Sequence, residues 1–393
     1  MRPLAAELRE RLAALKAVGL SRQLLPAGGL DFASNDYLGL ARDPALRADL
    51  LARLAHLPVN TPLFAPASRL LGGTLPAHLA LEERLARFKG TEAALLFPSG
   101  YQANVGLLSA LLGPGDRAIS DAANHASLID GLRLAGCTRR IVPHLDFAAI
   151  ERELAAAKSE SPGAGRTYLV TESLFSMDGD VAPLDRYVDL AERHGASLIV
   201  DDAHATGLYG EARGSGLAES FGVERRAAAI VATLGKALGV AGGFVAGPRV
   251  LIDYLISRCR SFLFTTAPPP LLLCAVEAAL DRMEAEPERR RRALGLAERL
   301  RSRLREAGLD CLASQGPLVP VVLGENRRAV AVAEALAARG FDVRAARPPT
   351  VAPGTARLRI SVHADRTEEE VDALAVALLA VLEGEPAGGE GGR

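Results

Sequence analysis

Between residues 90 and 250, apolar residues come in short, almost unbroken runs instead of alternating with polar ones. The runs cover residues 93–97, 118–120, 167–171, 197–201, 228–234 and 243–247. Unbroken runs of this length are typical of strands that are buried on both faces, as in parallel sheets covered by helices. Segments with helical spacing lie between most of the runs. The pattern therefore predicts an α/β domain with a mainly parallel sheet.

The first 90 residues predict helices around one short strand. MRPLAAELRERLAALKAVGL has apolar residues at helical spacing among acids and arginines, which indicates an amphipathic helix and not a signal peptide. LDFASNDYLGL contains the strand-like segment, and a turn into another helix follows it. HLALEERLARFKG predicts a further amphipathic helix with Gly90 as its C-cap.

The last third of the chain predicts a smaller α+β domain. A long helical stretch should begin after the prolines at 268–270 and continue to Gly308. Thr367 followed by Glu370 is a capping-box start for the last helix. The other expected elements are strands in PLVPVVL, FDVRAA and ARLRISV and helices at 327–339 and 367–382. We expect an N-terminal helical arm with a short strand at 1–50, a large domain at 51–275, a small domain at 276–383 and a disordered tail at 384–393.

Charge and composition exclude several classes of function. The 393 residues carry a formal net charge of −1, so there is no electrostatic argument for binding nucleic acid or a membrane surface. No apolar run approaches the roughly 18 residues that a membrane span requires. The four cysteines are scattered without metal-ligand spacing, which argues against a metal site or a disulfide framework and favours a reducing cytoplasm.

Lys236 stands in an unusual place for a charged residue. It follows an apolar run and is surrounded by small residues in IVATLGKALGVAGG. Of the 46 Lys+Arg, the other lysines are Lys16, Lys89 and Lys158, which lie in polar, helix-like surroundings where either cation would serve. A lysine amine can lose its proton and attack a carbonyl, whereas arginine stays protonated. Lys236 is therefore either a covalent catalyst or a lysine that extends to solvent from a strand end.

Polar residues follow five of the predicted strands, where ligands of open parallel sheets bind. These residues are Ser99-Gly100-Tyr101, Asn124-His125, the run 171–180, Asp201-Asp202 with His204, and Lys236. The turn at Gly100 opens a helix and suits a phosphate through free backbone N–H groups, although an ordinary turn has the same composition. His125 could stack on a flat ligand or lie in solvent.

The two adjacent acids at the end of the run 197–201 need partners if they are buried. Alternation along a strand sends Asp201 and Asp202 to different sides. A cationic heterocycle or a metal would serve as such a partner; the alternative, an Asp that caps the next helix, would account for one of the two acids but not for the pair or His204. A metal would need further ligands, and the sequence has no such cluster nearby.

Common nucleotide and hydrolase motifs are absent. Gly235-Lys236 is not a Walker loop, because Ala237 replaces the required Ser or Thr. No GxGxxG opens the first βα unit, and no GxSxG elbow is present. A lone lysine, an acid pair and a histidine on converging loops favour an enzyme over a module that only binds.

Motifs along nearly the whole chain resemble the α-oxoamine synthase family of fold-type-I pyridoxal-phosphate enzymes. They are SNDYLGL, EERLARF, FPSGYQAN, NHASLIDG, TESLFSMDGD, VDDAHATGLYG, TLGKALG and RPPTVAPGTARLRI, in that order. The resemblance implies a large domain with a mainly parallel sheet, a smaller α+β C-terminal domain, pyridoxal 5'-phosphate as cofactor, and a homodimer.

The resemblance also implies roles for individual residues. Lys236 would bind the cofactor through an imine and act as a general base, Asp201 would pair with the ring nitrogen and His204 with the ring hydroxyl. His125 would stack on the ring. The phosphate would be held by Gly100 and Tyr101, with Ser176 and Thr233 near the cofactor and Thr266 reaching the partner's phosphate. Substrate residues would be Thr350, Arg359 and Arg22, with Ser21 as the alternative to Arg22.

The implied reaction is a decarboxylating condensation of an amino acid with a thioester. RPPTVAPGTARLRI most resembles the members that supply a precursor of biotin from L-alanine and pimeloyl-CoA or pimeloyl-acyl carrier protein. The alternatives are glycine C-acetyltransferase within the family, and an aminotransferase or a cofactor-binding protein without turnover outside it.

Overall fold

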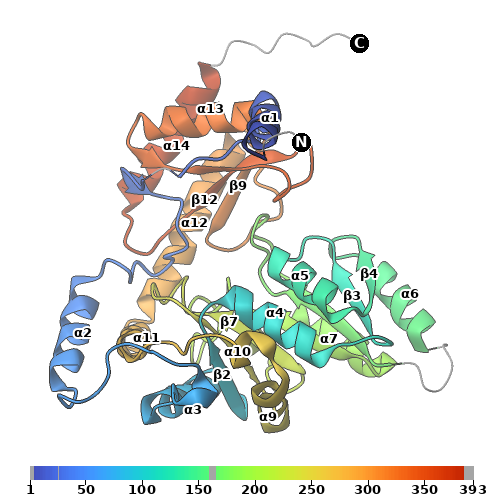
Figure 1. Cartoon of the computed structure of the whole chain (residues 1–393). Coiled ribbons are helices and arrows are strands. Elements are labelled where there is room, and N and C mark those ends of the chain that lie inside the picture. The colour runs from blue at the N-terminus through green and yellow to red at the C-terminus, as the bar shows by residue number, and fades with distance from the viewer. Residues whose placement is uncertain (1–3, 25, 159–164, 385–393) are drawn as a thin grey trace. The chain divides into compact units, whose positions relative to one another are not determined.

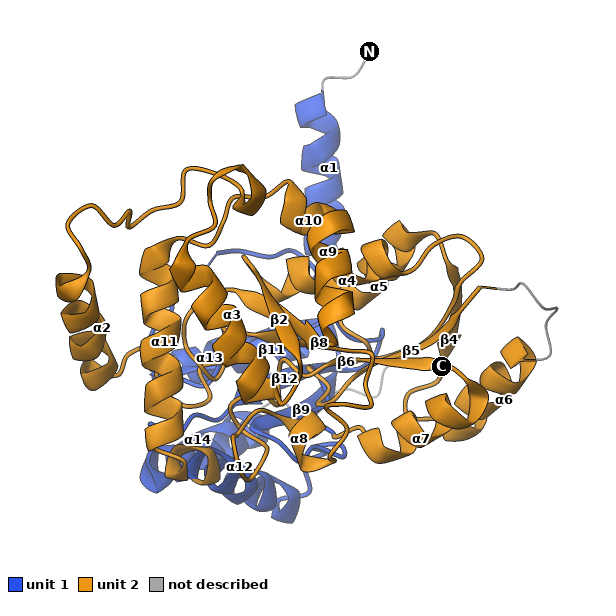
Figure 2. Cartoon of the chain, turned by 90° about the horizontal axis from the view of Figure 1, so that it is seen from below, with its two compact units in different colours: residues 1–34, 177–180, 292–393 blue, residues 35–176, 181–291 orange. Residues whose placement is uncertain are grey.

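The computed structural model describes residues 4–24, 26–158 and 165–384. The chain forms two compact units. Unit 1 comprises residues 1–34, 177–180 and 292–393, and unit 2 comprises residues 35–176 and 181–291 (Figure 2). The N-terminal segment therefore belongs to the unit that contains the C-terminal part of the chain. The expected tail at 384–393 lies outside the described residues except for Gly384.

Unit 2 is built on a seven-stranded sheet (Figure 1). Its strands are β2 (Ala93–Phe97), β3 (Arg117–Asp121), β4 (Thr138–Val142), β5 (Thr167–Glu172), β6 (Ser197–Asp201), β7 (Ala229–Thr233) and β8 (Gly243–Gly247). The order is β2-β8-β7-β6-β5-β3-β4, and β8 is antiparallel to its neighbours while the other strands are parallel to one another. The mainly parallel sheet predicted from the apolar runs is confirmed.

Helices cover both faces of this sheet. The described helices of unit 2 are α2 (Pro44–His56), α3 (Pro76–Lys89), α4 (Gly100–Leu111), α5 (Ala126–Ala135), α6 (Phe147–Lys158), α7 (Leu184–His194), α8 (Leu217–Ser220), α9 (Arg249–Arg258), α10 (Arg260–Leu263) and α11 (Pro270–Ala285), with a 3-10 turn at Arg69–Leu71. One core joins the sheet to α4, α5 and α9, and another joins it to α6 and α7. Along β6, Ile199 belongs to the first core and Leu198 and Val200 to the second, as expected for a strand buried on both faces.

Two parts of the chain depart from the expectations. Strand β4 was not expected, because its sequence TRRIV is polar and four of its five residues are exposed at the sheet edge. The predicted single helical stretch to Gly308 is wrong, because α11 ends at Ala285 and α12 (Glu288–Glu306) begins after Pro287. A proline has no N–H for a helix interior and breaks the ladder there.

Unit 1 has its own core around a three-stranded antiparallel sheet. The sheet has the order β11-β12-β9, formed by β11 (Arg344–Ala346), β12 (Ala356–Ser361) and β9 (Leu318–Gly324). The other elements are α1 (Leu4–Ala17), most of α12, α13 (Asn326–Ala337), α14 (Glu368–Glu383), and a parallel pair of β1 (Leu30–Asp31) and β10 (Phe341–Asp342). Phe32 is fully buried in this core, because backbone bonds tie it to Asp342 and Ser361.

The predicted helix caps are confirmed. Gly90 ends α3 in the left-handed region at φ 70°. At α14, Thr367 Oγ1 accepts from the Glu370 N–H at 3.2 Å, and Glu370 Oε2 accepts from the Thr367 N–H at 2.8 Å. Among the described helices, none has both the length and the apolar character to cross a membrane.

Candidate active site

The C-terminal ends of the parallel strands bring the predicted loops to one edge of the sheet in unit 2. Strands β2, β3, β5, β6 and β7 run in one direction, so the residues that follow them share an edge. Glu172 and Asp201 are direct neighbours in register at the ends of β5 and β6. The sheet therefore collects residues that are far apart in the sequence.

Asp201 is a buried carboxylate at the end of β6 with two fixed hydrogen bonds. Its Oδ2 accepts from Asn104 Nδ2 at 2.6 Å, and its Oδ1 accepts from the Ala203 N–H at 3.0 Å. Asn104 also donates to Ser127 Oγ at 2.9 Å. Asn104 was not among the predicted site residues, because nothing near it in the sequence distinguishes this helical amide until its partner, 97 residues away, is known.

His125 stands at the N-cap of α5, at the end of the loop after β3. Its Nδ1 lies 2.8 Å from Ser127 Oγ and accepts from the Ser127 N–H at 3.2 Å. Burial lowers the pKa of His125 most strongly. The Asp201 carboxylate raises this pKa and the Lys236 cation lowers it, and the net result is a pKa below the ordinary value of histidine. The imidazole is therefore neutral at pH 7.

Lys236 lies in the turn after β7 and is half-buried. Its charge acts on both His125 and Glu172, which places the amine among the groups at the sheet edge. Burial and the neighbouring Asp201 raise the pKa of Glu172 to about 8, against the influence of Lys236. A lysine that simply extends into solvent would have no reason to lie beside His125 and Glu172.

The turn after β2 forms an open helix start. Ser99 caps α4 by accepting from the Gln102 N–H, and Gly100 and Tyr101 supply first-turn N–H groups that have no acceptor within the helix. A Cβ at Gly100 would lie 3.3 Å from Thr233, and one at Gly243 would lie 2.6 Å from the Gly100 backbone. The Tyr101 ring is turned aside, with its hydroxyl donating to Asp130 at 2.6 Å. The turn is thus a narrow backbone cradle bordered by Thr233.

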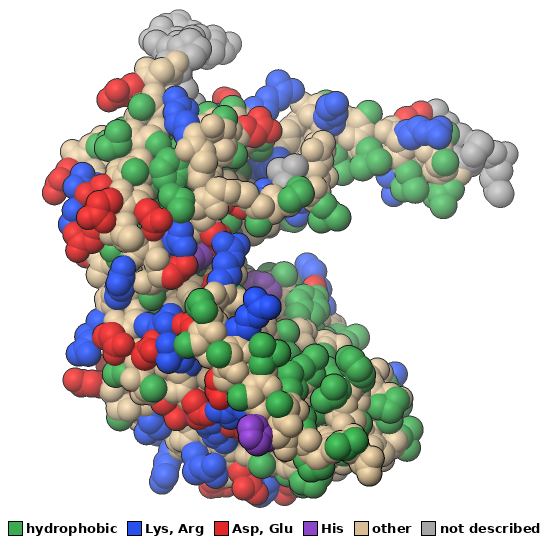
Figure 3. Space-filling view, turned by 90° about the vertical axis from the view of Figure 1, so that its left-hand side faces the viewer, with side chains coloured by type: hydrophobic (Ala, Val, Ile, Leu, Met, Phe, Trp, Pro, Cys, Tyr) green, Lys and Arg blue, Asp and Glu red, His purple; other side chains and the backbone are tan. Residues whose placement is uncertain are grey.

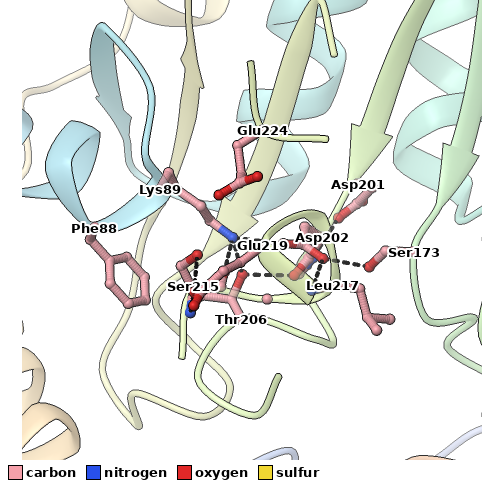
Figure 4. A network of polar contacts seen from close by, with 12 residues as sticks. Phe88, Lys89, Ser173, Asp201, Asp202, Thr206, Ser215, Leu217, Glu219 and Glu224 are labelled. Carbon is pink, nitrogen blue, oxygen red and sulfur yellow. Dashed lines mark hydrogen bonds and ion pairs between the residues drawn. The ribbon is translucent and has the colours of Figure 1, made fainter. Parts of the chain in front are cut away.

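Asp202 points away from Asp201, as alternation predicted, and binds Lys89 (Figure 4). Lys89 Nζ lies 2.8 Å from Asp202 Oδ2 and 2.8 Å from Thr206 Oγ1, and it also donates to the Ser215 carbonyl. Both charged side chains are fully buried. Lys89 thus has a buried partner that its polar, helix-like sequence neighbours did not indicate, since the end of α3 turns this residue into the protein.

His204 is buried beyond the end of β6, and its Nδ1 lies 2.7 Å from the hydroxyl of the fully buried Tyr37. Ser176 is also buried, and its N–H donates to Glu172 Oε2 at 3.2 Å. Thr266 is exposed in an isolated antiparallel bridge with Ser68. The predicted cofactor residues all belong to unit 2.

The predicted substrate residues belong to unit 1. Arg22 and Thr350 are exposed, and Arg22 donates to the Pro348 carbonyl at 3.4 Å. Arg359 is half-buried on β12, opposite Arg344 of β11. Ser21, the alternative to Arg22, accepts weakly from Arg347 through its carbonyl at 3.4 Å. Each of these roles stays a prediction.

The chain matches the family described as aminotransferase class I and II over residues 27–378. The chain belongs to this family. It is 45% identical over 388 residues to the 8-amino-7-oxononanoate synthase of Anaeromyxobacter dehalogenans strain 2CP-C, with 95% of each chain covered. It is 45% identical to the 8-amino-7-oxononanoate synthase of Geobacter sulfurreducens, over 88% of this chain and 86% of that one.

Solved structures of related enzymes have the same fold. The Sphingomonas wittichii serine palmitoyltransferase has a TM-score of 0.84 and 30% identity, with 97% of this chain and 96% of that chain covered. A serine palmitoyltransferase from S. paucimobilis with bound PLP-myriocin aldimine has a TM-score of 0.86 and 27% identity, with 97% and 99% covered. These likenesses agree with the predicted fold-type-I architecture.

Proposed function

We propose that this chain is an acyltransferase that condenses L-alanine with a pimeloyl thioester. The products are 8-amino-7-oxononanoate, carbon dioxide and the free thiol carrier, which is CoA or acyl carrier protein, in biotin biosynthesis. The observation that carries the proposal is the 45% identity over 95% of both chains to a relative of that name. The cofactor is pyridoxal 5'-phosphate, as in the structures of this family that contain it.

The residues at the sheet edge fit that cofactor. A phosphate suits the first turn of α4, since a Cβ at Gly100 would meet Thr233 and the N–H groups of Gly100 and Tyr101 face outward from the helix start. Asp201, held by Asn104 and the Ala203 N–H, suits a protonated ring nitrogen. His125, neutral at pH 7, suits stacking on the ring, and His204 suits its hydroxyl. The Lys236 amine is the residue that would hold the cofactor covalently.

When bound, the cofactor supplies an electron-accepting ring that stabilises negative charge at the substrate α-carbon. Asp201 would keep the ring nitrogen protonated through its buried carboxylate. Lys236 Nζ would take the α-proton of L-alanine, as a general base close to the reacting carbon. We assign Arg359 to the substrate carboxylate, because a guanidinium binds a carboxylate through two parallel hydrogen bonds. Thr350 and Arg22 complete the proposed substrate site.

We infer that two copies of the chain form a homodimer. Large apolar side chains are exposed on unit 2, including Val59, Phe64, Leu71 and Phe264. Figure 3 shows hydrophobic side chains gathered on the lower part of one face. Exposed apolar surface of this kind marks a protein interface. Phe264 lies two residues before Thr266, the residue assigned to the partner's phosphate. Sedimentation should give about twice 41.2 kDa, and a mass of one chain would contradict the dimer.

We place the enzyme in the cytoplasm, because its four cysteines are free. Its substrates would be small thioesters and an amino acid, with no nucleic acid or membrane partner.

Thiol release measures the proposed reaction directly. L-alanine, glycine and L-serine are each combined with pimeloyl, acetyl and palmitoyl thioesters, and the free thiol is followed. Release with L-alanine and the pimeloyl thioester supports the proposal. Release with glycine and acetyl-CoA alone would identify glycine C-acetyltransferase, and amino-group transfer without thiol release would identify an aminotransferase.

Lys236→Ala should leave no covalent cofactor on the protein after borohydride reduction, because the amine that would hold it is gone. Mass spectrometry of the reduced wild type should show the cofactor on the peptide that contains Lys236. Lys158→Ala is the control, since Lys158 is exposed at the end of α6. An adduct that persists in Lys236→Ala would remove Lys236 from its proposed role.

A further inference from the structure

Glu172 is a buried acid at the centre of the site to which neither the family motifs nor the chemistry above gives a task. It ends β5 and is 2% exposed. Its Oε2 accepts from the Ser176 N–H at 3.2 Å, and its backbone N–H donates to the side chain of Asn124, the residue before His125. One residue therefore joins the loop after β3, which carries His125, to the loop after β5, which carries Ser176.

The backbone of Glu172 strengthens the same connection. Its N–H donates to Asn124 Oδ1 at 3.0 Å, and Asn124 Nδ2 donates in turn to Ser120 Oγ at 2.9 Å and to the Val170 carbonyl at 2.7 Å. Asn124 immediately precedes His125 in the chain. The main chain of Glu172 thus fixes the loop that carries His125 to β5, while its side chain holds the Ser176 backbone in the next loop.

Glu172 also lies next to Asp201 in register, so two carboxyl groups meet at this edge of the sheet. Two neighbouring buried carboxylates repel each other, and one of them keeps its proton. Asp201 accepts from an amide and a backbone N–H at 2.6 and 3.0 Å, which suit the charged form. The titratable groups that act on Glu172 most strongly are Asp201 and Lys236.

We propose that Glu172 is a positioning residue that holds the Ser176 backbone through its side chain and the Asn124 side chain through its main chain, and that it stays protonated, so that Asp201 is the charged carboxylate at this edge. The part that concerns the cofactor rests on the proposed function, while the connection between the two loops does not. Glu172 acts through its neighbours and needs no contact with substrate. The raised pKa of Glu172, about 8, agrees with a neutral carboxyl at pH 7.

The connection is tested in the apoprotein by hydrogen–deuterium exchange. In Glu172→Ala, the amide of Ser176 should exchange about 10-fold faster, the effect of losing one hydrogen bond of ordinary strength. Glu172→Gln keeps an oxygen acceptor, so exchange should stay within about 3-fold of wild type. Glu219→Ala is the matched control, because Glu219 accepts from the N–H groups of Ala212, Arg213 and Ser215 and organises a different loop. Unchanged exchange at Ser176 in Glu172→Ala would overturn the proposal.

The protonated state is tested with Glu172→Gln, which changes neither size nor, at pH 7, charge. An acid with a pKa near 8 in the folded protein and near 4.5 in the unfolded chain makes the folded state bind more protons between these values. Stability from this group is then present below about pH 4.5 and is lost as pH rises toward 8. The urea midpoint of the wild type should fall more between pH 5 and pH 8 than that of Glu172→Gln. Equal falls in the two proteins would overturn the neutral carboxyl.

A titration with pyridoxal 5'-phosphate measures the consequence for the site. Glu172→Ala should raise the Kd about 10-fold through a displaced Ser176, the size expected for one lost hydrogen bond, while Glu172→Gln and Glu219→Ala should stay near wild type. A wild type that binds no cofactor would overturn the proposed function, and the exchange experiment would still decide the role of Glu172. An equal rise in Glu172→Ala and Glu219→Ala would overturn positioning by Glu172.

Discussion

Lys89→Met should destabilise unit 2 by about 3–5 kcal/mol, because it leaves the Asp202 carboxylate buried without its cation. Both side chains are fully buried, so solvent does not screen the loss. Asp202 would keep the Ser173 hydroxyl at 2.6 Å and the Leu217 N–H at 3.2 Å. Thr206 and the Ser215 carbonyl would lose a charged donor, each bond worth about 1.5–3 kcal/mol when counted alone. The loss of the ion pair and the loss of these hydrogen bonds describe partly the same interactions, so they are not added. The expected loss of unfolding free energy stays at about 3–5 kcal/mol, the range for a broken buried ion pair.

The chain offers a selective probe for this measurement. All six tyrosines, at positions 37, 101, 168, 187, 209 and 254, lie in unit 2, and the chain contains no tryptophan. Tyrosine fluorescence during urea denaturation of the apoprotein therefore follows the unfolding of unit 2. The free energy of unfolding comes from linear extrapolation, with variants compared at equal slope.

Lys89→Arg tests whether another cation can replace lysine as the buried partner of Asp202. The Lys89 site is closely packed, since a Cβ at Gly216 would lie 1.9 Å from Asp202 Oδ2. The larger guanidinium of Lys89→Arg should therefore lower the free energy of unfolding by about 1–3 kcal/mol. Lys158→Arg and Lys158→Met are the controls on the exposed end of α6, where changes should stay within about 0.5 kcal/mol. The double variant Lys89→Met/Asp202→Asn should lose at least about 1 kcal/mol less than the two single losses added together. A loss below about 1 kcal/mol for Lys89→Met would show that the buried Asp202 carboxylate does not depend on this cation.

Three further predictions concern single contacts. Asn104→Ala should lower the free energy of unfolding by about 1–3 kcal/mol and weaken binding of pyridoxal 5'-phosphate, because the buried Asp201 carboxylate loses its 2.6 Å donor. Urea denaturation measures the stability and cofactor titration measures the affinity. An unchanged affinity would contradict this prediction. His125→Asn should keep the N-cap of α5, because asparagine is also a good N-cap residue. The pKa of His125 is lowered on folding, so the unfolded state binds more protons below about pH 6.5 and the wild type loses stability there. The variant should therefore lose less stability than the wild type as pH falls from 7 to 5. Equal losses would argue against a neutral His125. Thr367→Ala should cost about 1 kcal/mol through the lost capping box, measured by urea denaturation followed by circular dichroism, and a neutral result would count against the cap.

Much of the site was foreseen because its residues follow strands that the apolar runs predict. The loop with His125, the acid pair and the turn with Lys236 each come directly after such a run, and parallel strands bring their ends to one edge. Glu172 lies in the predicted run 171–180 and Asn104 in the motif FPSGYQAN, but the contact of each with Asp201 was not foreseen. Asn104 acquires its meaning from Asp201, 97 residues later, and Glu172 from its register beside Asp201.

The sequence by itself determined the elements that depend on near neighbours. The buried strands, the Gly90 and Thr367 caps and the opposite directions of Asp201 and Asp202 follow from local periodicity and local hydrogen bonds. The tertiary structure alone decided which distant groups meet. Lys89 and Asp202 are 113 residues apart, and nothing near Lys89 in the chain distinguishes it from an exposed lysine. Strand β4 likewise has no apolar run, because an edge strand is held by pairing with its neighbour and needs little burial of its own.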